Sequence, residues 1–157
     1  MDLFSNMAQR EETLEAPRKP TVRKSPVDHW PLVVLLERAA YLRKLAALGD
    51  GAASDTLKES PEYSATLFVR SRSGDPETHA NFAVMFHILD GRATLASGRA
   101  AASAEPIATV GSSIDGAARY ELRAGDVVHI PAGQPHRILV AGDKSVTYLA
   151  VKTQVAL

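Results

Sequence analysis

The chain has 157 residues, of which 45% are hydrophobic and 23% charged, and this suits a single domain with a buried core. Its 18 basic and 18 acidic residues give a formal net charge of zero, so charge favours neither nucleic acid nor an anionic membrane as a partner. The chain contains no cysteine, which excludes disulfides, thiolate zinc sites and cysteine nucleophiles.

Hydropathy along the chain predicts neither a membrane span nor a signal peptide. The longest apolar run, Trp30 to Leu36, is far shorter than the roughly 20 residues that a span needs. Residues 1–10 contain an early acid and no continuous apolar core. We therefore expect a cytoplasmic protein whose partner is a small molecule, with no membrane and no nucleic acid bound.

The first 50 residues divide into a tail and a helix. Residues 1–27 are rich in proline and charge and predict a disordered tail. Residues 28–48 carry apolar side chains at helical spacing, with Asp28 as a candidate cap and Pro31 in the first turn. Gly49 and Gly51 would end this helix. We expect the segment 28–50 to pack on the remaining domain, residues 51–157, or on a dimer partner.

From residue 62 onward, short β-rich runs alternate with turn residues, which predicts an all-β sandwich or barrel. Asp90-Gly91 lies between two apolar runs and predicts a hairpin. Residues 97–105 are small and polar and predict a loop. The expected strands are Tyr63 to Arg70, Phe82 to Leu89, Ala93 to Ala96, Ile107 to Val110, Ala118 to Leu122, Val127 to Ile130, Arg137 to Val140 and Val146 to Val151.

The stretch 125–136 is the most informative part of the sequence. Pro131, Ala132 and Gly133 predict a tight turn after the strand 127–130. Pro135 then favours an extended backbone just before His136. This corner would hold the His136 imidazole rigidly, as a ligand aimed into a cavity requires.

The spacing of Gly125, Pro131, Gly133 and His136 resembles the second sequence motif of the cupins. The first cupin motif is present in part, since His79 and Gly91 match its first histidine and its final glycine. Asn81 stands in place of the second histidine, and Val84 stands where the family has a glutamate. The resemblance covers roughly residues 62–152.

The resemblance implies an all-β double-stranded β-helix, or jelly-roll barrel, with a central cavity. Typical cupins bind a divalent metal there through three histidines and one glutamate. Carried over by position, His79 and His136 would be metal ligands and Asn81 a candidate third ligand. The metal would be zinc, nickel, iron or manganese.

The missing glutamate weakens this ligand set, because two imidazoles and an amide carry no negative charge. Neutralisation would then come from the substrate, from hydroxide or from an acid elsewhere. Glu77 and Asp90 are close in sequence but are expected at turns.

Three further histidines and several arginines have weaker claims to the site. His129 is a further candidate as a replacement ligand or as a partner of one, and the alternative is that it is simply exposed. His87 is expected on the outer face of its strand, opposite Val84 and Phe86, and His29 at the helix start is expected to be structural or exposed. Arg70 and other arginines at strand ends are expected to face solvent.

Besides a structural dimer whose cavity is vestigial, two functions remain open at the level of sequence. One is a cupin enzyme that acts on a small organic acid, sugar or phenolic compound, either through a metal or through one histidine as a general base. The alternative is a non-catalytic module that binds or senses a small molecule without a functional metal. In both cases we expect a homodimer, since cupin sheets commonly pair and the helix offers apolar surface.

Overall fold

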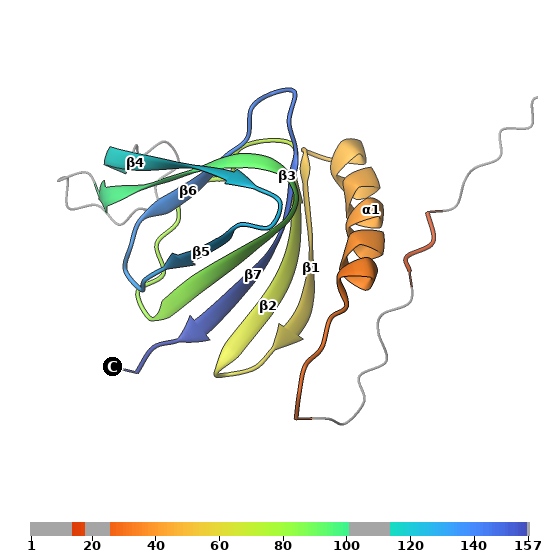
Figure 1. Ribbon diagram of the computed structural model, residues 1–157, viewed down its shortest axis with the longest axis horizontal. Coiled ribbons are helices and arrows are strands. Elements are labelled where there is room, and N and C mark those ends of the chain that lie inside the picture. The colour runs from red at the N-terminus through yellow and green to blue at the C-terminus, as the bar shows by residue number, and fades with distance from the viewer. Residues whose placement is uncertain (1–13, 18–25, 101–113, 157) are drawn as a thin grey trace, which may run out of the picture.

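The computed structural model describes residues 14–17, 26–100 and 114–156. Within these residues it contains one helix and seven strands (Figure 1). The elements are α1 (Leu32–Leu48), β1 (Ala52–Glu59), β2 (Tyr63–Arg70), β3 (Phe82–Ala100), β4 (Ile114–Arg123), β5 (Val127–Ile130), β6 (His136–Leu139) and β7 (Val146–Gln154).

The long strand β3 joins two antiparallel sheets. Its first half pairs with β7 on one side and β5 on the other, and the sheet continues through β2 to β1. Its second half pairs with β4 and β6. The two sheets face each other across a shared interior, which gives the β-barrel of jelly-roll type that the sequence predicts (Figure 1).

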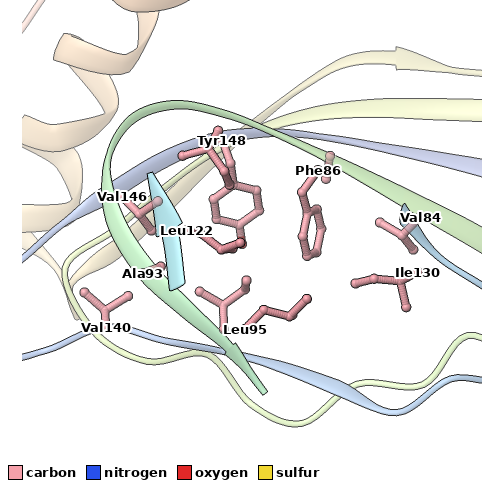
Figure 2. Close-up of a cluster of buried hydrophobic side chains, with 12 residues drawn as sticks. Val84, Phe86, Ala93, Leu95, Leu122, Ile130, Val140, Val146 and Tyr148 are labelled. Atoms are coloured by element: carbon pink, nitrogen blue, oxygen red, sulfur yellow. The ribbon is translucent and has the colours of Figure 1, made fainter. Parts of the chain in front are cut away.

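The barrel interior is filled by one apolar cluster contributed by β3 to β7 and the residue after β6. Figure 2 shows this cluster lying between the strands, with the rings of Phe86 and Tyr148 at its centre. Its members are Val84, Phe86, Ile88, Ala93, Leu95, Leu122, Ile130, Ile138, Val140, Val146, Tyr148 and Ala150. Burial of this area supplies most of the driving force for closing the barrel.

Helix α1 covers the outer face of β1 and β2 (Figure 1). Its apolar stripe, which includes Leu35, Ala39 and Leu42, packs on Leu67 and Val69 of β2. Alternate residues of β2 therefore face the helix, and the residues between them line the barrel interior. The helix packs on its own barrel, one of the two arrangements expected for it.

The helix begins at Leu32 and not at residue 28. Pro31 occupies the cap position with an extended ψ of 139°, and a proline disfavours helical geometry for the residue before it, here Trp30. Asp28 is therefore not the cap; its carboxylate accepts a hydrogen bond from the Tyr63 hydroxyl and lies 3.5 Å from Lys58 Nζ. The helix ends at Gly49, as predicted.

The prediction of a hairpin at Asp90-Gly91 is wrong, because β3 runs through both residues. Gly91 has a φ of +82°, and a β-bulge lies between Ile88 and Asp90. These features bend one strand from the first sheet into the second without reversing it. A Cβ at Gly91 would lie 2.0 Å from the Ser145 carbonyl oxygen, so the bend requires glycine.

The other predicted strands agree with the structure to different degrees. The bounds of β2 and β5 are those predicted, whereas β7 is longer and β1 was not foreseen. Strand β4 continues through Asp115 and Gly116, and β3 takes up residues 97–100 of the predicted loop. Residues 101–113, which include the strand expected at 107–110, and most of the expected tail lie outside the described residues.

The described part of the chain contains no helix with the length and hydropathy that a membrane span requires.

Candidate metal centre

The segment 74–79 lies against residues 133–138, and this arrangement builds the site. Glu77 and His136 exchange two backbone hydrogen bonds, with N···O distances of 2.8 and 3.0 Å. On either side, the Gly74 amide donates to the Ile138 carbonyl at 2.9 Å and the Gly133 amide donates to the His79 carbonyl at 2.8 Å. An otherwise irregular connection is thus held in register with β6.

Glu77, His79 and His136 form a cluster whose ligand atoms all lie within 4.8 Å of one another. The Glu77 Oε2 atom is 3.6 Å from His79 Nε2 and 3.7 Å from His136 Nε2. Two atoms that each bind one ion at about 2.0–2.2 Å lie at most about 4.4 Å apart, so the carboxylate and each imidazole are close enough to share an ion.

The His136 ring is oriented by its own turn. Its Nδ1 atom lies 3.0 Å from the Gln134 carbonyl oxygen, and because a carbonyl only accepts, Nδ1 carries the proton. In the neutral ring the Nε2 atom then keeps its lone pair, and this atom lies 3.7 Å from Glu77 Oε2. The side chain is 3% exposed, and the turn that holds it is the predicted one, with Gly133 at a φ of +77°.

Burial lowers the pKa of His79, and the positive charge of Lys152 lowers it further, while Glu77 opposes the shift. A lowered pKa keeps this imidazole neutral near pH 7, the form that binds a metal. The Nε2 atoms of His79 and His136 are both buried without a hydrogen-bond partner. Two orphaned imidazole nitrogens beside a carboxylate are what a divalent ion would satisfy, so the residues present fit such an ion.

Aromatic rings form the wall behind the cluster. Phe86 meets the His136 ring edge-on at 6.1 Å between centroids and contacts Tyr148 at 5.1 Å. Phe68 stacks on Tyr148 at 5.2 Å. The Tyr148 hydroxyl accepts a hydrogen bond of 2.9 Å from Arg70 Nε, and burial raises the pKa of this tyrosine, which keeps its hydroxyl protonated.

The cluster lies in a small chamber that adjoins a wider space. The chamber has a volume of about 30 Å³, enough for an ion and a water molecule but not for an organic ligand. The wider space, here called the vestibule, has about 340 Å³ and is lined by residues that include Ser60, Ser64 and Thr66. Phe68, His79, Ala150 and Lys152 line both spaces and so lie at the boundary between them.

The structure brings together two of the residues that the sequence proposes, His79 and His136. Asn81 is exposed in the turn before β3, and its backbone carbonyl accepts a hydrogen bond from the Val155 amide. Val84, at the family's glutamate position, is 1% exposed in the apolar core. A role for Asn81 as a ligand stays a prediction.

His129 and His87 lie away from the chamber lining. His129 is exposed on β5, where Val128 and Ile130 turn inward, and it borders a separate hollow of about 680 Å³ between β4 and β5. His87 is half-buried on the face of β3 opposite Val84 and Phe86. His29 is exposed.

Glu77 supplies the carboxylate that the motif lacks. In the sequence, Glu77 stands out only as an acid near His79 that is expected at a turn. In an extended segment, residues two apart point to the same side, so the Glu77-Thr78-His79 spacing could have indicated a shared face. Arg70 also lines the chamber, whereas the sequence suggested that it faces solvent.

The fold and the cluster together define a jelly-roll barrel with a candidate metal centre. The family model described as "Cupin domain" matches residues 109–152, which contain the second motif. Over these residues the chain is similar to a cupin domain. No curated protein sequence matches it.

Solved structures agree with this fold. The cupin domain of Schizosaccharomyces pombe Cnp3 matches with a TM-score of 0.52 and 15% identity, over 66% of this chain and 65% of that one. A cupin superfamily protein from Desulfitobacterium hafniense matches with a TM-score of 0.50 and 20% identity, over 71% of this chain and 88% of that one. A cupin protein from Bacteroides fragilis matches with a TM-score of 0.50 and 16% identity, over 66% of this chain and 78% of that one. At these identities the likeness shows the fold alone.

Proposed function

We propose that this protein binds one divalent transition-metal ion through Glu77, His79 and His136, and that it holds a small organic ligand beside that ion. The observation that carries the proposal is the pair of buried, unpartnered Nε2 atoms on His79 and His136, both within 3.7 Å of one carboxylate oxygen. Two imidazoles and a carboxylate suit zinc, nickel, iron or manganese better than magnesium or calcium.

The bound ion would supply Lewis acidity, or oxygen activation if it is redox-active, to a ligand next to it. The chain's own residues set the surroundings. Phe86 and Phe68 exclude water from the back of the chamber. Tyr148, whose oxygen already accepts from Arg70, has its proton free to donate to a ligand atom. The vestibule provides the volume that an organic ligand needs and the chamber lacks.

Metal content measured on untagged protein tests the proposal. We expect close to one equivalent of a transition metal in the wild type after loading, and its loss in H136A and in H79A. H129A is the matched control, because this histidine is exposed and lies outside the cluster. The proposal fails if the wild type holds no metal under any loading condition, or if H129A loses as much as H136A.

A second measurement separates an enzyme from a binding module. Metal-loaded protein that binds a small organic acid, sugar or phenolic compound and converts it would be an enzyme whose ligand occupies the vestibule beside the chamber. Binding without conversion, with the metal in place, would make the protein a metal-assisted binding module.

A further inference from the structure

The chamber that contains Glu77, His79 and His136 is lined by more positive than negative side chains. Three cationic side chains line it, Arg70, Arg137 and Lys152. Two carboxylates, Asp75 and Glu77, line it as well. Across the part of the chain that the structure describes, none of the three cations forms an ion pair. A divalent ion on Glu77 would enlarge the positive surplus.

Arg70 and Arg137 are each partly satisfied by uncharged partners. Arg70 Nε donates to the Tyr148 hydroxyl at 2.9 Å, and its guanidinium carbon lies 5.5 Å from the Phe68 ring centroid. Arg137 Nε donates to the Gly74 carbonyl at 2.8 Å. Both arginines are therefore fixed in place and contribute a constant positive field to the chamber.

Lys152 differs from the two arginines in its position and in its lack of partners. It continues the inward-facing row Tyr148, Ala150 and Lys152 of β7, and it lines both the chamber and the vestibule. It is half-buried, and no hydrogen bond or ion pair is found for its ammonium among the described residues. A partly desolvated ammonium without a partner is unfavourable unless an anion joins it.

The vestibule is lined by the hydroxyl groups of Ser60, Ser64 and Thr66, and by the exposed carboxylate of Glu59. Lys152 pairs across the sheet with Ser64, whose hydroxyl faces the vestibule, and Thr66 is the next inward residue on β2. Neither hydroxyl has a hydrogen-bond partner within the described part of the chain. A ligand whose anionic group meets Lys152 would thus find hydroxyl groups along its body.

We propose that Lys152 is the specificity-determining residue of the cavity and binds the carboxylate of a small hydroxylated acid, whose body occupies the vestibule. This inference rests on the proposed function, because it names the class of ligand that the same cavity takes. Lys152 would then select acids over neutral molecules of the same shape.

Calorimetric titration of the metal-loaded full chain tests the inference. The probes are lactate, malate and gluconate, with lactamide and glucose as neutral counterparts. We expect at least one acid to bind at least about tenfold more tightly than its neutral counterpart, and K152M to remove at least about tenfold of that affinity. K144M is the matched control, because Lys144 lies on an exposed turn and pairs with Asp143.

Several outcomes would overturn the role of Lys152. They are equal binding of acids and neutral counterparts, unchanged affinity in K152M, an equal loss in K144M, or no binding of any of the three acids. Should K152M fail to fold, K152Q keeps a polar side chain and carries the same expectation.

Metal analysis of the same samples separates this failure from failure of the proposed function. A wild type without metal overturns the proposed function. Repeating the titrations on H136A keeps Lys152 under test in that case, because Lys152 does not belong to the cluster that would hold the ion. A preference for the acids must persist there, and equal affinities would count against the inference.

Discussion

Glu77 and His136 are joined twice, by a pair of backbone hydrogen bonds and by the approach of the Glu77 carboxylate to within 3.7 Å of His136 Nε2. The bridge is isolated, so it positions one acid against one imidazole without extending a sheet. In the candidate site a carboxylate from a connecting segment thus lies beside the two imidazoles, while Val84 stands at the glutamate position of the cupin motif.

Replacing that carboxylate tests its place in the site. We expect E77Q to weaken metal binding by more than about tenfold, because the substitution removes the only anionic member of the cluster while preserving its shape. Competition with a chelator measures the affinity. D75N is the matched control, since Asp75 lines the same chamber but does not belong to the cluster. Equal affinities for E77Q and the wild type would remove Glu77 from the ligand set.

The parts of the fold that could be predicted from sequence are those governed by local chemistry. The turn at 131–134 follows from Pro131 and Gly133, and the Pro135-His136 corner follows from proline geometry. The alternation in Tyr63–Arg70 gives β2 its two faces. These local rules suggested the barrel and the rigid corner at His136, and the resemblance to the cupin motif placed that histidine at a cavity.

The remaining features depend on contacts between segments far apart in the sequence. Asp90-Gly91 has the composition of a hairpin, but the close approach of Ser145 turns it into a bend within one strand. Glu77 reaches the site only because residues 74–79 pair with 133–138. Arg70 lies at a strand end but points inward, where Tyr148 accepts its hydrogen bond. Sequence patterns do not encode such pairings directly.

The Gly91 bend gives a stability prediction. We expect G91A to lower the free energy of unfolding by about 2–5 kcal/mol, because it adds the cost of a positive φ to a clash with the Ser145 backbone. G125A is the matched control: Gly125 also has a positive φ, of +94°, but a Cβ there meets nothing within 4 Å, so about 1–2 kcal/mol is expected. Urea denaturation measures both. A loss no greater in G91A than in G125A would contradict the close approach.

The contact of α1 with β1 contains a charge pair, Arg38 with Asp55, whose side chains are 9% and 14% exposed. Arg38 Nη1 also donates to the Pro17 carbonyl at 2.7 Å. We expect D55A to destabilise the protein by about 3–5 kcal/mol, because it leaves the guanidinium buried without its carboxylate. The double variant R38M/D55L should be less destabilised than D55A, since no charge remains buried. Chemical denaturation of the single and double variants measures the coupling between the two side chains. If the losses of the single variants add up to the loss of the double variant, the pair does not act as a unit.

We expect the stability of the folded chain to depend on pH through the Tyr63 hydroxyl. Its hydrogen bond to the Asp28 carboxylate, with a smaller contribution from burial, raises the pKa of Tyr63 to about 12. An unfolded tyrosine has a pKa of about 10, so between pH about 10 and 12 the folded chain holds a proton that the unfolded chain has lost. The stabilisation is complete below pH about 10 and is lost as the pH rises through this window.

We therefore expect the stability advantage of the wild type over Y63F to shrink as the pH rises from about 10 to 12. The buried Tyr148, whose pKa is also raised, is present in both proteins and cancels in the comparison. Denaturation curves at several pH values check this, and a constant difference between the two proteins would show that Tyr63 ionises alike in the folded and unfolded chains.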